Sequence, residues 1–168
     1  ASSPEYLSGN TYTPSASITL YAVWSNNTYT VTYNANGGNG TMASDIAYYG
    51  IGFKTKQNVF TKSGYTFIGW NEKADGSGTV WDLTTSGTYE NGAEWPWSYD
   101  YDITLYAQWA PWSYTITYDK NGATSGTMSN TSHKYGDGSI LSKMTFVHPG
   151  YNFIGWSNSK TGAVICSD

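Results

Sequence analysis

The sequence has few charged residues, and this scarcity excludes several classes of protein. Lysine and arginine together number 8 and aspartate and glutamate 12 among 168 residues, which gives a net charge of −4. Nucleic-acid binding needs clustered basic residues that neutralise phosphates, and attraction to an anionic membrane surface needs them too. The sequence has no such cluster, so we expect no nucleic-acid partner.

Cysteine and long apolar runs are also scarce. Cys166 is the single cysteine, which excludes a disulfide within the chain. No stretch approaches the roughly 18 apolar residues of a membrane-spanning helix, so we expect no membrane insertion. The sequence shows no signal peptide, and any export signal is expected to lie outside it.

Aromatic residues and glycine are abundant instead. Aromatics make up 17% of the sequence, against 12% for charged residues, and there are 16 tyrosines and 19 glycines. Aromatic and β-branched side chains suit a pleated sheet, whereas the strong helix formers are scarce. The composition predicts a mainly β fold of the α+β class, with a short helical turn expected only near residues 54–60.

The sequence repeats itself with a period of about 85 residues, and internal repeats indicate tandem units. Three phrases recur: "ITLYAVW" (18–24) as "ITLYAQW" (103–109), "YTVTY" (29–33) as "YTITY" (114–118), and "GYTFIGW" (64–70) as "GYNFIGW" (150–156). Their order predicts three segments. Residues 1–24 are the C-terminal part of a preceding repeat, 28–109 a complete repeat with an aromatic insertion near 95–101, and 113–168 the N-terminal part of a following repeat.

The phrases of the middle copy carry a family resemblance. In order they are "YTVTYNANGG" (29–38), "GYTFIGW" (64–70), "DGSGT" (75–79) and "LYAQW" (105–109). This series resembles the Listeria–Bacteroides repeat, found as the B repeat of internalin-like surface proteins. The resemblance implies an elongated array of small β-grasp-like units in a secreted or wall-attached bacterial protein. It implies a spacer or adhesion role and brings no catalytic residues or cofactor.

Residue patterns within the middle copy predict its local structure. Alternation of apolar and polar residues predicts strands at 29–33, 65–70 and 103–108, and a further strand is expected near 43–49. Asn36 and Gly37 suit the positive φ angles of a tight turn between strands. The tryptophans of the repeated phrases are expected in the core: Trp24, Trp70, Trp109 and Trp156.

The aromatic insertion is the candidate binding site. Trp95, Trp97, Tyr99 and Tyr101 occur in one copy only, and binding residues often lie on such insertions of a rigid scaffold. Contact with a host glycan or protein is one interpretation. The alternative is that these rings pack on the neighbouring unit.

Nothing in the sequence indicates an enzyme. His133, His148 and Cys166 have no counterparts in the middle copy, so a cysteine–histidine pair is not expected to be catalytic. The segment 75–78 reads as a turn, because a calcium loop needs more oxygen ligands. We therefore expect neither a metal site nor a cofactor.

The order of the phrases suggests how units join. We hypothesise that Ile18, Leu20, Ala22 and Trp24 belong to a strand that completes the sheet of residues 113–168 in another chain, by strand addition. The alternative is a covalent joint within a longer array. Both predict a stalk, a fibre or an adhesion spacer whose partners are neighbouring repeats. A carbohydrate- or protein-binding module, such as one appended to a secreted glycosidase, is the competing interpretation.

Overall fold

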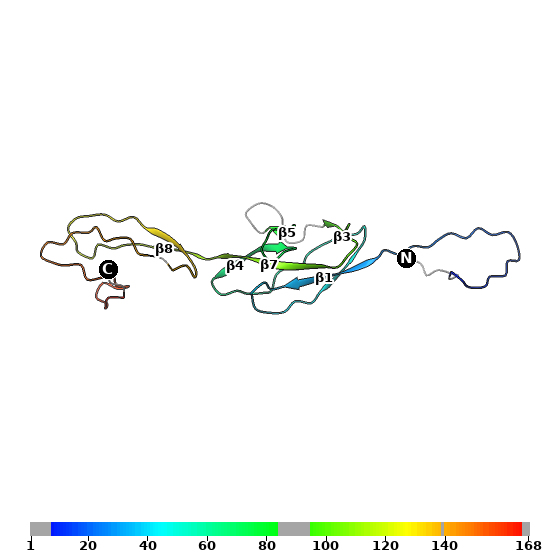
Figure 1. Ribbon diagram of the computed structural model, residues 1–168, viewed down its shortest axis with the longest axis horizontal. Helices are drawn as coiled ribbons and strands as arrows, with labels where there is room; N and C mark the ends of the chain where they lie inside the picture. The colour runs from blue at the N-terminus through cyan, green and yellow to red at the C-terminus, as the bar shows by residue number, and fades with distance from the viewer. Residues whose placement is uncertain (1–7, 84–94, 139, 166–168) are drawn as a thin grey trace. The chain divides into compact units, whose positions relative to one another are not determined.

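The computed structural model describes residues 8–83, 95–138 and 140–165, which form strands joined by turns and loops (Figure 1). The strands are β1 (Thr28–Asn34), β2 (Asp45–Tyr48), β3 (Gly52–Phe53), β4 (Tyr65–Asn71), β5 (Val80–Leu83), β6 (Trp95–Pro96), β7 (Ile103–Pro111), β8 (Ser113–Ile116) and β9 (Thr131–Lys134). No helix occurs in these ranges. The fold is therefore mainly β, as the composition predicts.

The chain divides into two compact units. The first comprises Ala1–Thr61 and Phe67–Gln108, and the second comprises Lys62–Thr66 and Trp109–Asp168. The segment Lys62–Thr66, which we name the Gly64 turn, thus belongs to the middle copy in sequence and to the second unit in space. The repeat boundaries drawn from the sequence stay a prediction.

The first unit is built on an open sheet with the strand order β2-β1-β7-β4-β5 (Figure 1). Strand β1 pairs with β2 antiparallel. It pairs with β7 in parallel, with Val31 opposite Ile103 and Asn34 opposite Tyr106. Parallel neighbours need a long crossover connection, and the chain from β2 to β6 supplies it. The closing strand β7 consequently lies in the middle of the sheet, between β1 and β4.

The predicted opening strand and turn are confirmed. Val31 and Tyr33 are buried and Thr32 is exposed, as a half-buried strand requires. Asn36 and Gly37 then have φ angles of 49° and 80°. Asparagine and glycine are the residues that adopt this left-handed conformation at least cost, so the sequence here dictates the turn.

A cluster of four rings fills the centre of the first unit. We name Tyr33, Phe60, Phe67 and Trp70 the first ring cluster. The centroid of Trp70 lies 5.0 Å from Tyr33, 6.0 Å from Phe60 and 5.0 Å from Phe67. All three rings are tilted or edge-on to it, the arrangements that aromatic pairs prefer. Trp70 is fully buried, and its Nε1 donates to the carbonyl oxygen of Lys56 at 3.3 Å.

The helical turn expected at residues 54–60 is wrong. This segment has no helical structure, because side chains capture its backbone groups. The backbone N–H of Phe60 donates to Asn58 Oδ1 at 2.9 Å, and Asn58 Nδ2 donates to the carbonyl oxygen of Phe60 at 3.0 Å. Asparagine side chains often compete with helical hydrogen bonds in this way.

The second unit repeats the ring cluster with almost the same geometry. We name Tyr118, Phe146, Phe153 and Trp156 the second ring cluster. The centroid of Trp156 lies 5.0 Å from Tyr118, 6.3 Å from Phe146 and 5.0 Å from Phe153. The glycine before each central tryptophan, Gly69 or Gly155, has a φ of 140° in both units. The repeated phrase therefore folds in the same way twice.

The strands of the second unit match β1 and β2 only in part. Strand β8 pairs with β9 antiparallel, from Ser113 opposite Lys134 to Ile116 opposite Thr131. Strand β8 ends at Ile116. The counterpart of Ile116 is Val31, the residue at which β1 begins to pair with β7. The described residues of the second unit contain no counterpart of β7.

Within the second unit, the Gly64 turn contacts the start of the third copy. The backbone N–H of Trp112 donates to the carbonyl oxygen of Gly64 at 2.8 Å, and Trp112 Nε1 donates to Thr66 Oγ1 at 3.1 Å. The rings of Tyr65 and Tyr135 pack edge-on at 5.8 Å. A Cβ at Gly64 would overlap the Tyr135 ring, so this close approach requires glycine.

Candidate functional site

Strand β7 in the first unit shows what this sheet requires of a closing strand. Ile103, Leu105 and Ala107 are buried, and Leu105 is 0% exposed. Asn36 anchors the strand, since its Nδ2 donates to the carbonyl oxygens of Ala107 at 2.9 Å and Ala74 at 2.8 Å. The closing strand thus contributes alternate apolar side chains to the core. It also contributes one backbone carbonyl that accepts from the side-chain amide of Asn36, which we name the amide anchor.

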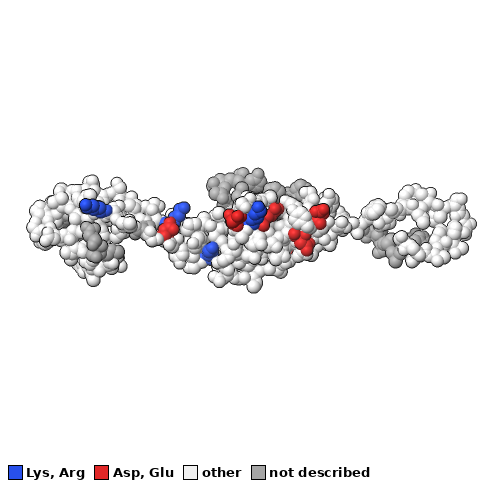
Figure 2. All heavy atoms as spheres, in the orientation of Figure 1, with Lys and Arg blue, Asp and Glu red and all other residues white. Residues whose placement is uncertain are grey.

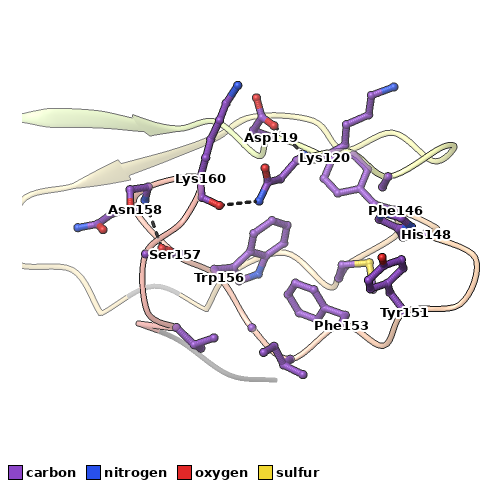
Figure 3. A pocket seen from close by; sticks show the side chains of 18 of the residues that line it. Asp119, Lys120, Phe146, His148, Tyr151, Phe153, Trp156, Ser157, Asn158 and Lys160 are labelled. Carbon is purple, nitrogen blue, oxygen red and sulfur yellow. Dashed lines mark hydrogen bonds between the residues drawn. The ribbon is translucent and has the colours of Figure 1, made fainter.

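The second unit has a pocket in the corresponding position. The pocket has a volume of about 690 Å³ and is lined by residues within 117–123, 144–148 and 151–164, among them parts of 117–121 and 152–158 (Figure 3). Residues 117–119 and 152–157 of this lining are the counterparts of the end of β1 and of β4, the two strands that flank β7. Figure 3 shows the rings of Phe153 and Trp156 on one side of the pocket and Asp119 on another. We name this pocket the strand slot.

Side chains beside the strand slot are more exposed than their counterparts in the first unit. Trp156 is half-buried, whereas Trp70 is fully buried. Ile154 is 74% exposed, whereas Ile68 is half-buried. Among the described residues of the second unit, no strand covers these side chains as β7 covers their counterparts.

The amide anchor is half engaged in the second unit. Asn121 is the counterpart of Asn36, and its φ of 44° repeats the same turn. Its Nδ2 donates to the carbonyl oxygen of Lys160 at 3.2 Å, which corresponds to the bond from Asn36 to Ala74. The counterpart of the bond to Ala107 is not formed among the described residues.

The segment 18–24, which we name the tail segment, carries the sequence of a closing strand. It matches residues 103–109 at six of seven positions. The residues predicted as a joining strand are all exposed and outside any strand: Ile18, Leu20, Ala22 and Trp24. Trp24 is 83% exposed, so the prediction that it lies in the core is wrong. In β7, which β1 and β4 flank, alternate residues of this phrase are buried, whereas in the tail segment the phrase is exposed. The joining role of the tail segment stays a prediction.

The four aromatic residues of the insertion occupy different environments. Trp95 lies in β6, opposite Phe53 of β3. Trp97 is 1% exposed, Tyr99 is half-buried and Tyr101 is 55% exposed. Of the last three, Tyr101 therefore offers the most surface to a ligand, and the binding role of the insertion stays a prediction.

Trp97 belongs to a second group of packed rings in the first unit. Its centroid lies 5.3 Å from Phe53, 5.7 Å from Trp81 and 5.4 Å from Tyr99. Tyr99 in turn packs edge-on against Tyr101 at 5.5 Å. Trp97 therefore extends the core, whereas Tyr101, at the other end of this row of packed rings, reaches the surface.

A polar cluster surrounds Tyr33 in the first unit. The Tyr33 hydroxyl donates to Asp45 Oδ2 at 2.9 Å and accepts from the backbone N–H of Lys56 at 2.9 Å. Lys56 Nζ lies 2.8 Å from Asp45 Oδ1. Burial, with a further contribution from Asp45, raises the pKa of Tyr33 well above its ordinary value of 10.0, so the hydroxyl stays protonated and acts as a donor.

The counterpart cluster in the second unit contains no ion pair. Thr131 and Ser142 occupy the positions of Asp45 and Lys56. Tyr118 keeps a contact with each of them, and hydrogen bonds from the Thr131 hydroxyl and the Ser142 backbone lower the pKa of Tyr118. The tyrosine and its two hydrogen-bonded neighbours are thus kept in both units, while the charged side chains are exchanged for hydroxyls.

Charged groups are sparse and mixed on the face shown in Figure 2, with no patch of one sign. Within the described ranges, no three His, Cys, Asp or Glu side chains converge in a way that could hold a metal ion. The described part of the chain also contains no helix long and apolar enough to cross a membrane. Asp75 is a turn residue, since its Oδ1 accepts from the backbone N–H of Ser77 at 3.0 Å.

The repeated ring cluster and sheet define the class of this chain as a tandem β-repeat module. The model of the Listeria-Bacteroides repeat domain family matches residues 29–108 and 114–166, and the chain belongs to this family. The resemblance inferred from the repeated phrases is thereby confirmed. No solved structure matches the chain.

Three curated relatives are similar to the chain. A protein of Evansella cellulosilytica, named as a Gly-rich membrane protein, is 31% identical over 163 residues, covering 89% of this chain and 18% of that protein. Another from the same organism, named as a membrane protein, is 39% identical over 99 residues, covering 57% and 14%. Internalin H of Listeria monocytogenes is 40% identical over 103 residues, covering 61% and 16%. The chain spans less than a fifth of each relative.

The sequence interpretation missed the anchoring role of Asn36 and Asn121. The sequence predicts only a turn at Asn36, because asparagine before glycine accounts for the backbone there. Asparagine recurs at this turn with the same spacing as the closing-strand phrase. This recurrence is the sequence signal for a second role. The left-handed backbone of this asparagine and of the following glycine fixes the direction of the side-chain amide. Only the sheet topology shows that β7 lies beside this amide.

Proposed function

We propose that the chain is a non-enzymatic part of a secreted or cell-surface bacterial protein, in which tandem units serve as a stalk, fibre or adhesion spacer. The observation that carries this proposal is the ring cluster, which recurs in both units with matched centroid distances. Membership of the repeat family and similarity to internalin H and to proteins named as membrane proteins support a place at the cell surface.

In this proposal each unit is a small β-grasp-like repeat that joins its neighbours head to tail. The Gly64 turn supports it, because the turn accepts the first residues of the following copy through Trp112 and Tyr135. Neighbouring repeats are the partners, either along one covalent array or between chains by strand complementation. A small unit gains stability from such neighbours, since each contributes packing that a lone repeat cannot supply.

We expect antibodies raised against the purified chain to label intact cells of the organism that carries the parent protein. A surface stalk is exposed to large probes, so labelling should not require permeabilised cells, and protease added to intact cells should remove it. The control is an antibody to a cytoplasmic protein, which should label permeabilised cells only. Labelling that appears only after permeabilisation would contradict the proposal.

A binding module is a second candidate, supported by the exposed ring of Tyr101 beside Tyr99. Exposed tyrosine provides contact area with a polar end. If this insertion binds a glycan or host protein, Tyr101→Ala should reduce retention on an array by about thirtyfold or more, the size of effect that defines a dominant contact residue. Trp97→Ala is unsuitable because that ring is core. The matched control is Tyr48→Ala, which removes an exposed ring of β2. A stalk predicts no retention for any variant.

A further inference from the structure

We propose that the edge strand β2 of the first unit pairs with β2 of a second copy of this chain, antiparallel and about a two-fold axis. The inference goes beyond the head-to-tail joints of the proposed stalk, because it assigns a lateral contact between two chains. Strand β2 is the last strand of the five-stranded sheet, so its outer side has no partner strand among the described residues. An edge of this kind can accept a further strand.

The backbone of β2 offers hydrogen-bonding groups to a further strand. The backbone N–H of Tyr49 donates to the carbonyl oxygen of Asn27 at 3.0 Å, so the backbone groups of Tyr49 face β1. Successive residues of an antiparallel strand alternate in the side to which their N–H and C=O groups point. Ile46 and Tyr48 therefore direct theirs toward the free edge. The carbonyl oxygen of Tyr48 also accepts from the N–H of Ile51 at 3.0 Å, which leaves its second lone pair for a partner strand.

The side chains at this edge are apolar and exposed. Ile46 is 53% exposed and Tyr48 is 50% exposed. Ala47 between them is buried, so both side chains lie on the face of the sheet away from the core. On that face they lie opposite Thr30 and Thr28 of β1, which are uncharged. Covering these apolar side chains with those of a second copy removes them from water, which favours association.

The corresponding edge of the second unit is protected against pairing. Strand β9 occupies the position of β2 and also has four residues, but it carries Ser132 and Lys134 where β2 carries Ile46 and Tyr48. A lysine on an edge strand opposes further pairing, because its charge resists removal from water. The two edges have the same place and length, so their side chains alone distinguish an edge that can associate from one that cannot.

A preceding copy does not cover the edge positions that β2 would use. In the second unit the Gly64 turn, which belongs to the preceding copy in sequence, contacts Tyr135 immediately after β9. Ser132 and Lys134 are nevertheless exposed there. The exposure of the same two positions in the first unit therefore does not depend on what precedes that unit in the parent protein.

Two-fold pairing sets Ile46 of each copy opposite Tyr48 of the other, with Ala47 opposite Ala47 at the axis. Each dimer then contains two cross-strand pairs of a β-branched and an aromatic side chain, a favourable combination. Asp45, at the start of β2, is paired with Lys56 Nζ at 2.8 Å, so the copies meet without a net charge at the contact. Both copies use the same surface, and such a contact closes as a dimer.

The test is sedimentation equilibrium of the 168-residue chain over a range of concentrations, with Cys166→Ser to prevent disulfide formation. The expected result is a mass that rises from that of one chain to that of two. Tyr48→Lys, which introduces the residue of β9, should weaken association by about tenfold or more, because each dimer loses two cross-strand pairs and gains two edge lysines. Ile46→Ser, the other residue of β9, should weaken association as well.

Val59→Lys is the matched control for Tyr48→Lys. Val59 is 62% exposed and lies outside any strand, so this variant also replaces an exposed apolar side chain by lysine but leaves the edge intact. Its association should equal that of the parent. Because Ile46, Tyr48 and Val59 are all exposed, the circular dichroism of each variant should match that of the parent.

Amide hydrogen exchange tests the place of the contact. The backbone N–H groups of Ile46 and Tyr48 are bonded in the dimer, so they should exchange more slowly as the concentration rises. The N–H groups of Ser132 and Lys134 lie on the protected edge of β9 and should exchange at the same rate at every concentration. The second unit thus provides an internal control in the same sample.

The register is tested by mixing two single-cysteine chains in the Cys166→Ser background. Residues directly opposite in an antiparallel ladder bring Cα atoms to a distance that a disulfide can bridge. A mixture of the Ile46→Cys chain with the Tyr48→Cys chain should therefore give more disulfide-linked pairs on a non-reducing gel than either chain alone. Equal cross-linking of the Ile46→Cys chain by itself would overturn the proposed register.

A monomer at every concentration would overturn the inference, and so would association that Tyr48→Lys and Val59→Lys change equally. Exchange at Ile46 and Tyr48 that does not slow while the mass rises would also overturn it, because the copies would then associate through another surface. None of these outcomes affects surface labelling of cells, so the stalk proposal and this inference fail in different experiments.

Discussion

Trp70→Ala is expected to remove a large share of the stability of the first unit. Trp70 is fully buried and touches every other ring of the first ring cluster. Truncating a buried tryptophan to alanine costs about 3–5 kcal/mol, a large share of the roughly 5–15 kcal/mol of a whole domain. Urea unfolding followed by circular dichroism should show the loss, and amide hydrogen exchange should place it in β1, β4 and β7.

The matched control for this prediction is Trp24→Ala. Trp24 occupies a repeated phrase like Trp70 but is 83% exposed, and surface substitutions change stability by no more than about 0.5 kcal/mol. The two variants remove the same side chain from the same protein. Equal midpoints for Trp70→Ala and the parent would show that the ring cluster does not hold the unit together.

Asn71→Ala is expected to produce the second-largest loss. Asn71 is 1% exposed. Its Oδ1 accepts from the backbone N–H groups of Lys73 and Gly78, and its Nδ2 donates to the carbonyl oxygens of Gly76 and Gly78. Removing the amide leaves these groups to find water or stay unpaired, at about 1–3 kcal/mol for each one that stays buried. Differential scanning calorimetry should show a lower unfolding temperature.

The third copy offers a natural control for this variant. Ser157 is the counterpart of Asn71, and its hydroxyl accepts from the backbone N–H of Ser159 at 3.2 Å. Asn71→Ser keeps one acceptor and should therefore unfold at a temperature between those of the parent and Asn71→Ala. If Asn71→Ser and Asn71→Ala were equally destabilised, the acceptor role assigned to the amide oxygen would be wrong.

The sequence predicted the parts of the fold that are determined locally. The opening strand follows from the alternation around Val31 and Tyr33, and the turn follows from Asn36 and Gly37, because each depends on neighbouring residues only. The closing strand could be assigned for the same reason, from Ile103, Leu105 and Ala107. Because the sequence repeats, the same assignments apply to the corresponding residues of the next copy.

The remaining features depend on partners distant in sequence. The tail segment and β7 are nearly identical in sequence, yet one is exposed and the other buried, because only β7 lies between β1 and β4. Trp97 could not be assigned to the core either, since Phe53 and Trp81 come from separate parts of the chain. Periodicity shows which side chains alternate, and topology decides which of them are covered.

The parallel pairing of β1 with β7 has a mechanical consequence. These strands lie at the two ends of the segment 29–108 that the family model matches. Tension along the chain therefore pulls β1 at Thr28 and β7 at Pro111 in opposite directions. The two strands are loaded in shear, and the hydrogen bonds between them must break together and not one after another. Resistance to force depends on the unfolding rate, which a shear geometry slows. A unit with this strand arrangement would keep its length when flowing liquid pulls on the chain.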